Sequence, residues 1–157
     1  YCQDNITSWL DWRMLEKNKD LFEFFKFMID YRKKHPVIRK KLDNAVCGME
    51  AMHAHDVNAE RMEVPQNAKT LAVSFAGYDR KKGKDDLVYV AVNAYWEEVK
   101  ITLPNLANHG AWYLSVDTYG DEKGKYFYQE GEEIRIDREY VMKPRSIVVF
   151  TGREILR

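Results

Sequence analysis

The chain has 157 residues, a length that fits one domain or one domain with part of another. Hydrophobic residues make up 45% of the chain and charged residues 32%, which provides for a core and a solvated surface and excludes an intrinsically disordered protein. Lys and Arg total 25, as do Asp and Glu, so no overall positive charge would attract nucleic acid or anionic lipid. We therefore expect a globular protein with neither nucleic acid nor a membrane as partner.

The sequence contains no run of 18 apolar residues, so we expect no transmembrane helix. Its two cysteines, Cys2 and Cys47, form no CxxC pair, and a chain this rich in apolar residues needs no disulfide. These features favour a reduced, cytoplasmic protein. The chain starts at Tyr1 without an initiator Met, so we expect that the start is a cut and that any signal peptide would lie upstream.

Residues 4–41 carry a helical pattern. Apolar residues recur at spacings of three and four, which predicts a helix over residues 20–34. Asp20 and Glu23 have the spacing of a capping box, and His35-Pro36 would end the helix because a residue before proline avoids helical dihedral angles. Further apolar residues lie outside the main stripe, so we expect this helix to pack on two sides: Phe22, Phe27 and Ile29.

After Asn44 the apolar pattern changes to a period of two, and Gly, Asn, Asp and Lys separate the apolar runs. This favours a mainly β fold, an antiparallel β-sandwich of Greek-key type over residues 45–157, preceded by a helical segment over residues 1–44. The pattern predicts about seven strands: Val46–Met52, Thr70–Gly77, Leu87–Ala94, Val99–Leu103, Ala111–Asp117, Glu133–Ile136 and Ser146–Thr151.

Alternation along these strands assigns side chains to faces of the sheets. On the second predicted strand, Leu71, Val73 and Phe75 should face the interior together. On the fifth, one face should carry three apolar side chains, with Tyr113 and Ser115 on the opposite face: Trp112, Leu114 and Val116.

Acidic residues are numerous, but the sequence does not identify two of them across a cleft, as a glycosidase requires. The acidic pairs fall at turns or strand starts, where solvated charge is the simpler interpretation. No GxSxG motif, phosphate loop or dinucleotide fingerprint occurs, so the residues alone suggest no cofactor. The pairs in question are Glu97-Glu98, Asp85-Asp86 and Glu132-Glu133.

His53 and His55 would point to the same side of a strand, with Asp56 next to them. A metal would need a further ligand, and the sequence nearby offers no clear one. We therefore favour a pair of histidines with ordinary hydrogen-bond partners over a metal site.

The opening segment, residues 1–12 (YCQDNITSWLDW), is rich in groups that suit sugars, because indole rings stack on pyranose faces and Asp and Asn bind hydroxyls. The alternative is that Trp9, Leu10 and Trp12 pack a short helix capped by Asn5 or Thr7. Composition leaves both interpretations open.

Several motifs in order resemble one enzyme family. The segments YCQDN, SWLDW and RKKHP, followed by VAVNA at residues 90–94 and KPRSIVV at residues 143–149, are similar to isoamylases, glycogen-debranching enzymes and pullulanases of the alpha-amylase superfamily. The likeness covers the end of the catalytic (β/α)8 barrel, at residues 1–44, and the C-terminal sandwich, at residues 45–157.

This resemblance implies a parent enzyme that hydrolyses α-1,6 branch linkages in glycogen or starch by a retaining mechanism with an Asp nucleophile, a Glu acid/base and a second Asp. All three would lie upstream of Tyr1, so no residue of this chain is assigned as catalytic and the chain alone should be inactive. Asp4 and Asn5 match the loop after the eighth barrel strand, where barrel active sites lie, and are the expected glucan-binding residues.

The resemblance leaves the role of the sandwich open. It would stabilise the barrel by covering the last barrel helix, which makes the barrel a partner of this chain, or it would be an accessory α-glucan-binding module. An unrelated all-β interaction domain is a third and weaker reading. Apolar surface left by the cut makes a dimer of this chain a further hypothesis. A binding module would use exposed rings on one sheet face, for which the candidates are Tyr89, Tyr95, Trp96, Tyr113, Tyr119, Tyr126 and Tyr128.

Overall fold

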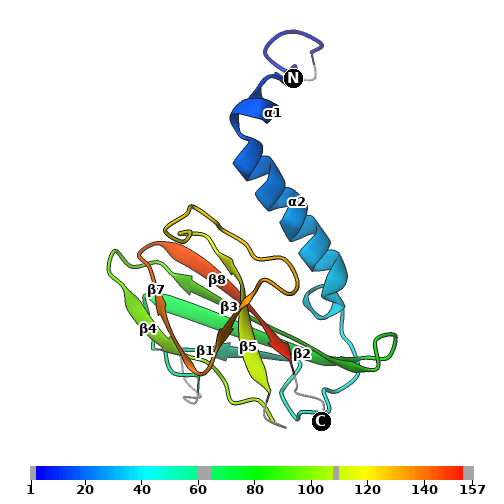
Figure 1. Cartoon of the computed structure of the whole chain (residues 1–157), viewed down its shortest axis with the longest axis vertical. Helices are drawn as coiled ribbons and strands as arrows, with labels where there is room; N and C mark the ends of the chain where they lie inside the picture. Colours follow the sequence, from blue (N-terminus) through cyan, green and yellow to red (C-terminus); the bar gives the residue numbers. More distant parts are fainter. Residues whose placement is uncertain (1–2, 60–64, 108–109, 154–157) are drawn as a thin grey trace.

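The computed structural model describes residues 3–59, 65–107 and 110–153. Helices α1 (Met14–Lys17) and α2 (Lys19–Lys34) and the 3₁₀ turn η1 (Pro36–Ile38) precede all strands, and they rise from one side of a β structure (Figure 1). The described strands are β1 (Met52–His55), β2 (Thr70–Asp79), β3 (Lys84–Asn93), β4 (Val99–Thr102), β5 (Ala111–Asp117), β6 (Ile134–Ile136), β7 (Glu139–Met142) and β8 (Ser146–Arg153).

The strands form two antiparallel sheets. A six-stranded sheet, here the main sheet, has the order β1-β2-β3-β8-β5-β6, and a two-stranded sheet, here the small sheet, pairs β4 with β7. The last strand, β8, lies between β3 and β5, so the centre of the main sheet joins segments that are distant in sequence. The expected mainly β, antiparallel architecture is confirmed.

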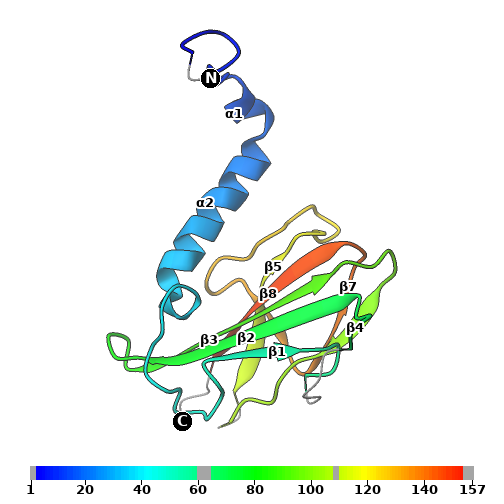
Figure 2. The same ribbon diagram turned by 180° about the vertical axis from the view of Figure 1, so that it is seen from behind.

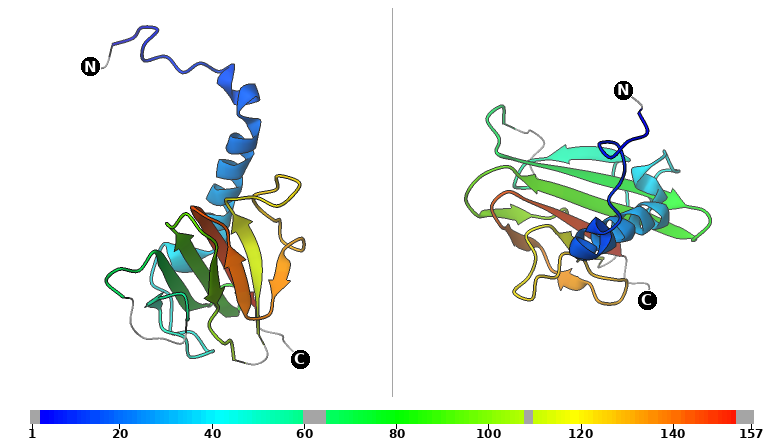
Figure 3. Two further views of the ribbon diagram at one scale, coloured as in Figure 1. Left: turned by 90° about the vertical axis from the view of Figure 1, so that its left-hand side faces the viewer. Right: turned by 90° about the horizontal axis from the view of Figure 1, so that it is seen from above.

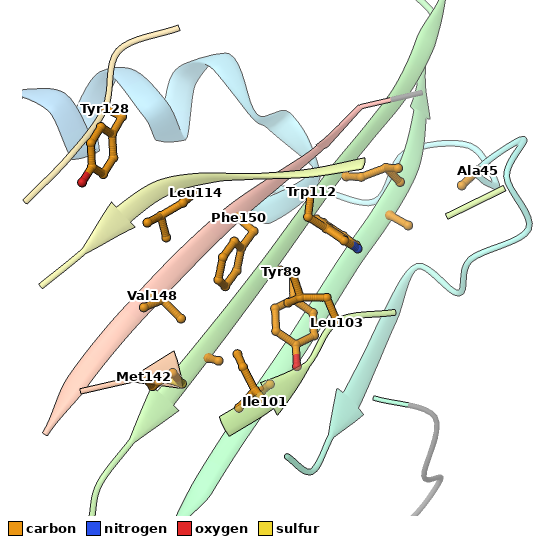
Figure 4. Packing of buried hydrophobic residues seen from close by; sticks show 14 residues of the cluster. Ala45, Tyr89, Ile101, Leu103, Trp112, Leu114, Tyr128, Met142, Val148 and Phe150 are labelled. Atoms are coloured by element: carbon orange, nitrogen blue, oxygen red, sulfur yellow. The ribbon is translucent and has the colours of Figure 1, made fainter. Parts of the chain in front are cut away.

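The principal core lies between the two sheets. The main sheet contributes Tyr89, Trp112 and Phe150, and the small sheet contributes Ile101 and Met142, all almost fully buried (Figure 4). The Trp112 indole also donates a hydrogen bond of 2.7 Å to the carbonyl of Pro104, which satisfies its only polar atom.

A second apolar cluster covers the opposite face of the main sheet. Tyr31 of α2 and Val37 of η1 pack there on Val88, Val116 and Val149 of three adjacent strands. The main sheet is therefore coated on one face by the small sheet and on the other by the foot of the helical segment (Figure 3).

The helix is close to its prediction but begins differently. It starts at Lys19 and its N-cap is Asn18, which makes no side-chain cap hydrogen bond, so the capping box expected from Asp20 and Glu23 does not form. It ends as predicted: the amide of His35 bonds the carbonyl of Tyr31 at 2.9 Å, and Pro36 follows in η1.

Two strand predictions were wrong. The first strand is Met52–His55 instead of residues 46–52, because the amides of Val46 and Cys47 bond the carboxylate of Asp85 and not a neighbouring strand. Strand β7 was missed; this four-residue segment becomes a strand by pairing with β4, with Val99 opposite Met142.

The predicted faces of β2 are reversed. Leu71 is 47% exposed and Phe75 packs in the cluster on the helix side, whereas Ala72 and Ala76 belong to the principal core. The core side of the neighbouring strand carries the large ring of Tyr89, and small side chains on β2 leave room for it.

A β-bulge in β5 divides the face expected for Trp112, Leu114 and Val116. Leu114 is opposite Phe150 and Val116 is opposite Val149, so two residues of β5 face one residue of β8. Trp112 and Leu114 accordingly lie in the principal core, while Val116 lies in the cluster on the helix side.

Candidate functional site

The last turn of α2 is joined to the main sheet by a chain of buried hydroxyl groups. The Tyr31 hydroxyl shares a hydrogen bond of 2.8 Å with the hydroxyl of Thr151, which shares another of 2.8 Å with Ser115. Burial raises the pKa of Tyr31, with smaller opposing effects from these hydrogen bonds, so the phenol stays protonated. Tyr31 and Thr151 are 120 residues apart in sequence, and their contact ties the helix to the sheet.

Two adjacent carboxylates of β3 hold the chain that leaves α2. Asp86 accepts hydrogen bonds from His35 Nδ1 at 2.6 Å and from the Val37 amide at 3.0 Å, and it is buried. Asp85 accepts bonds from the amides of Val46 and Cys47 at 2.9 and 2.8 Å. The expectation that this pair is solvated was therefore wrong, because both side chains satisfy backbone amides near the foot of α2.

Aromatic contacts complete this helix–sheet junction, by which we mean the contact of α2 and η1 with the main sheet. Phe27 stacks on Phe127 with ring centroids 4.5 Å apart, and Phe24 lies 6.3 Å from the same ring. A cavity of about 350 Å³ remains beside the junction, lined by charged residues of α2, β3 and the segment after β5.

The cavity brings together Ser115, His35 and Asp86, the residue types of a nucleophilic triad. However, the hydroxyls of Ser115 and Thr151 bond each other and Tyr31 instead of the His35 ring. The buried Glu133 forms an ion pair with Arg153, whose guanidinium also lies 4.8 Å from the Tyr113 ring centroid. These contacts join helix to sheet, and they assign the cavity no catalytic group.

The side of α2 that faces away from the sheet is apolar and exposed. Phe25 is 58% exposed, and the helix leans away from the main sheet over its first turns (Figure 2). The helix thus has two apolar sides, of which one, with Phe27, contacts the sheet, and packing of the other side stays a prediction. No described helix has the length and apolar character needed to cross a lipid bilayer. The exposed side consists of Leu21, Phe22, Phe25 and Ile29.

Asp4 and Asn5 lie in an exposed turn at the far end of the helical segment from the main sheet (Figure 1). The Asn5 side chain accepts a hydrogen bond of 3.0 Å from the Thr7 amide, and the Asp4 carboxylate accepts one from the Trp9 indole. Their contacts are local, and their assignment as glucan-binding residues stays a prediction.

His53 and His55 lie side by side on β1, with ring centroids 4.7 Å apart. His53 pairs with Glu50 at 3.0 Å, and His55 donates to the Ala59 carbonyl at 3.1 Å and bonds the Ser74 hydroxyl at 2.8 Å. Burial lowers the pKa of His55 and favours the neutral ring. Nowhere in the three described ranges do three or more His, Cys, Asp or Glu side chains gather as a metal ion would require.

The seven aromatic candidates for sugar binding do not share one sheet face. Tyr89 and Tyr128 are buried, and Tyr113 lies under the Arg153 guanidinium. The two rings most exposed are those of Trp96, after β3, and Tyr119, after β5. No sheet face in the described structure therefore presents the row of rings that a platform would need.

Comparisons with known proteins agree with this architecture. The family model described as "Isoamylase, C-terminal" matches residues 46–151, which include every described strand except the last two residues of β8. The glycogen operon protein GlgX homolog of Mycobacterium tuberculosis is 44% identical over 41 residues, 26% of this chain and 6% of that protein. The homolog of Mycobacterium bovis gives the same values.

Isoamylase 3, chloroplastic, of Oryza sativa subsp. japonica is 27% identical over 119 residues, 75% of this chain and 14% of that protein. The alignments therefore cover only a small part of each of these curated relatives. The family model, in contrast, covers most of this chain and, apart from the end of β8, all strands of both sheets. The chain belongs to the family of isoamylase C-terminal domains.

Proposed function

We propose that this chain is the C-terminal part of a glycoside hydrolase that cleaves α-1,6 branch linkages in glycogen or starch, and that its sandwich stabilises the catalytic barrel. The family match and the two kinds of relative, one named for a glycogen operon and one named an isoamylase, support this proposal. A branched α-glucan is then the substrate of the parent enzyme, and the barrel is the principal partner of this chain.

The two-sided helix is the observation that carries the proposed role. One side of α2 is fixed to the main sheet through Tyr31, Phe27 and Phe24, while the side with Phe25 is exposed. Large exposed apolar surface on a globular protein marks a surface that contacts something else. A helix that packs on the barrel sheet with one side and on the sandwich with the other would have this pattern.

We accordingly assign residues 1–44 to the end of the barrel and residues 45–157 to the sandwich. Asp4 and Asn5 would contact glucan in the intact enzyme, because active sites of such barrels lie on the loops that follow the strands. The nucleophile, the acid/base and the stabilising carboxylate would come from the rest of the barrel, so this chain alone should not hydrolyse glucan.

The decisive experiment compares this chain with a longer protein that includes the region encoded upstream of Tyr1. The longer protein should release reducing ends from glycogen and should remove its branches, whereas the chain of 157 residues should release none. An upstream region without a barrel, or a barrel that lacks the three carboxylates, would refute the proposal.

A second experiment tests the stabilising role. In the longer protein, Phe25→Asp should lower the midpoint of thermal unfolding and the activity together, because it would place a charge between helix and barrel. The matched control is Glu16→Asp in the exposed helix α1, which should change neither. If Phe25→Asp leaves both quantities unchanged in the longer protein, α2 does not pack against the barrel through this side.

A further inference from the structure

The turn that follows β3 carries two adjacent aromatic residues, of which Trp96 is exposed and Tyr95 is half-buried. The rings of Tyr95 and Trp96 are 4.2 Å apart between centroids and tilted by 41°. The ammonium group of Lys69 lies 3.7 Å from the Tyr95 centroid and 5.6 Å from that of Trp96. Trp96 itself is 65% exposed. Its indole can therefore present an apolar face to a ligand, next to a second aromatic ring.

The turn is held in place without help from the Trp96 ring. Asn93 is 1% exposed, and its side-chain amide donates to the carbonyls of Glu97 at 2.9 Å and Lys143 at 3.0 Å. Its side-chain oxygen accepts the amide of Tyr95 at 3.0 Å. Trp96 is therefore presented on a backbone that is fixed before any ligand arrives, which reduces the entropy lost on binding.

The turn beside β8 supports the same arrangement from the other side. The Arg145 amide donates to the Tyr95 carbonyl at 3.0 Å, and Arg145 has a φ of 51°, a left-handed conformation that is uncommon outside glycine. A non-glycine residue in this conformation costs free energy that the neighbouring contacts must offset. Strained, fixed backbone of this kind is more frequent at binding sites than elsewhere.

The residues of this turn and its neighbours carry both signs of charge. Lys69, Lys143 and Arg145 supply cations, and Glu97 and Glu98 supply anions, with Lys143 and Glu98 forming an ion pair. A rim of mixed charge does not favour a polyanion such as nucleic acid, whose binding depends on a large excess of positive charge. Such a rim suits a neutral ligand with many hydroxyl groups. Ammonium groups donate hydrogen bonds to hydroxyl oxygens, and carboxylates accept hydrogen bonds from hydroxyl groups.

We propose that the Tyr95–Trp96 turn is a surface binding site for an α-glucan chain, with the apolar face of a pyranose on the Trp96 ring and its hydroxyls on Lys69 and the neighbouring carboxylates. The identity of the sugar rests on the proposed function; the ring geometry and the mixed charge of the rim do not. The site lies at the end of β3 opposite to Asp85 and Asp86, away from the helix–sheet junction. It would hold a long glucan on the sandwich while another part of the same polymer is in the active site.

Electrophoresis of the chain through native gels with and without glycogen tests this site, with maltoheptaose as a soluble competitor. The chain should be retarded by glycogen, and Trp96→Ala should weaken the apparent affinity at least tenfold while leaving the thermal unfolding midpoint unchanged. Phe25→Ala is the matched control, since Phe25 is also an exposed ring but lies on α2, and it should leave the retardation unchanged.

Three results would overturn the inference: a chain that glycogen does not retard, equal retardation of Trp96→Ala and the unchanged chain, or loss of retardation in Phe25→Ala with retention in Trp96→Ala. The debranching assay of the longer protein reports on the proposed function independently, because it measures cleavage and not binding by the sandwich. Failure of this inference would therefore be distinguishable from failure of the proposed function.

Discussion

Asp86 lies on a central strand, yet both of its carboxylate oxygens serve the segment that leaves α2. One accepts from the His35 ring and the other from the Val37 amide. The His35 ring also lies on that of Tyr31, with centroids 4.3 Å apart. A single buried side chain thus fixes the end of the helix, the start of η1 and their position on the sheet.

Replacing this carboxylate should be costly. Asp86→Ala leaves the buried amide of Val37 without its acceptor, and we expect the free energy of unfolding to fall by about 2–3 kcal/mol. Urea denaturation followed by circular dichroism measures the change. Asp30→Ala is the control: Asp30 pairs with Lys34 at the surface of α2, where both side chains are about half exposed, and its loss should cost at most about 0.5 kcal/mol. Equal effects of the two variants would contradict the role of Asp86.

His55 predicts a pH dependence of stability. Burial lowers its pKa in the folded chain, so below the unfolded value of about 6.5 the unfolded state binds more protons than the folded state. Stability should therefore decrease as the pH falls below about 6.5. His55→Gln should reduce this decrease between pH 7 and pH 5, measured as the urea midpoint at each pH, whereas His53→Gln should retain most of it. An unchanged slope in His55→Gln would refute the assignment.

The sequence predicts residue chemistry better than residue partners. It identified His53 and His55 as neighbours on one side of a strand, which is correct, because alternation is a local property. It could not identify Asp86 as buried or Asp85 as bound to backbone amides, because their partners lie 38 to 51 residues away along the chain. The assignment of Asp4 and Asn5 came from resemblance alone and stays a prediction.

At the scale of elements, α2 has two apolar sides, of which one packs on the main sheet and the other is exposed. Only Tyr31 of the helix is buried, and the half-buried residues Phe24, Phe27 and Met28 lie toward the sheet. The hydrophobic effect therefore fixes one side of the helix, and the other side depends on whatever covers it.

Paired substitutions on α2 separate the two sides. Phe27→Ala should lower the free energy of unfolding of this chain by about 2 kcal/mol, because it removes the stack on Phe127. Phe25→Ala should change it by at most about 0.5 kcal/mol, because Phe25 is largely exposed. Chemical denaturation of both variants measures the difference. A greater loss from Phe25→Ala would mean that the exposed side is already covered within this chain.

The positions of most helices and strands could be predicted from the local pattern of apolar residues. The wrong predictions concern segments whose structure depends on pairing with distant parts of the chain. The helix and the strands around Val73, Val90 and Val148 were predicted within a few residues, because their apolar runs are long. Strand β7 was missed because four residues become a strand only beside β4. The reversed faces of β2 and the bulge near Ser115 depend on how side chains fill the space between sheets, which alternation does not describe.

At the scale of the whole molecule, each face of the main sheet is covered by a different part of the chain. The small sheet closes the principal core, and the helix–sheet junction closes the other face. The family assignment was predictable from ordered motifs, and the match over residues 46–151 confirms it. That the sandwich covers this helix was expected from the resemblance, but the individual contacts of the helix–sheet junction were not predictable, since they join residues from both ends of the sequence.

The exposed side of α2 should make this chain associate with itself when nothing else covers that side. Sedimentation velocity across a wide concentration range should show a reversible dimer, and Phe25→Glu should shift it toward monomer by adding charge to the apolar surface. Glu16→Asp in α1 should leave the association unchanged. A monomer at all concentrations, or a dimer that Phe25→Glu does not weaken, would contradict this expectation.

The way α2 leaves the sheet also has a consequence for its dynamics. An isolated helix of one or two turns is marginal in water, and Phe24 is the first residue of α2 that packs in the described cluster on the main sheet. Amide protons near Phe22 should therefore exchange with solvent deuterium much faster than those near Tyr31, as a gradient along one continuous helix. Binding of a barrel to the exposed side would abolish that gradient. The exchange rate near Phe22 therefore reports whether the exposed side of α2 is packed against another structure.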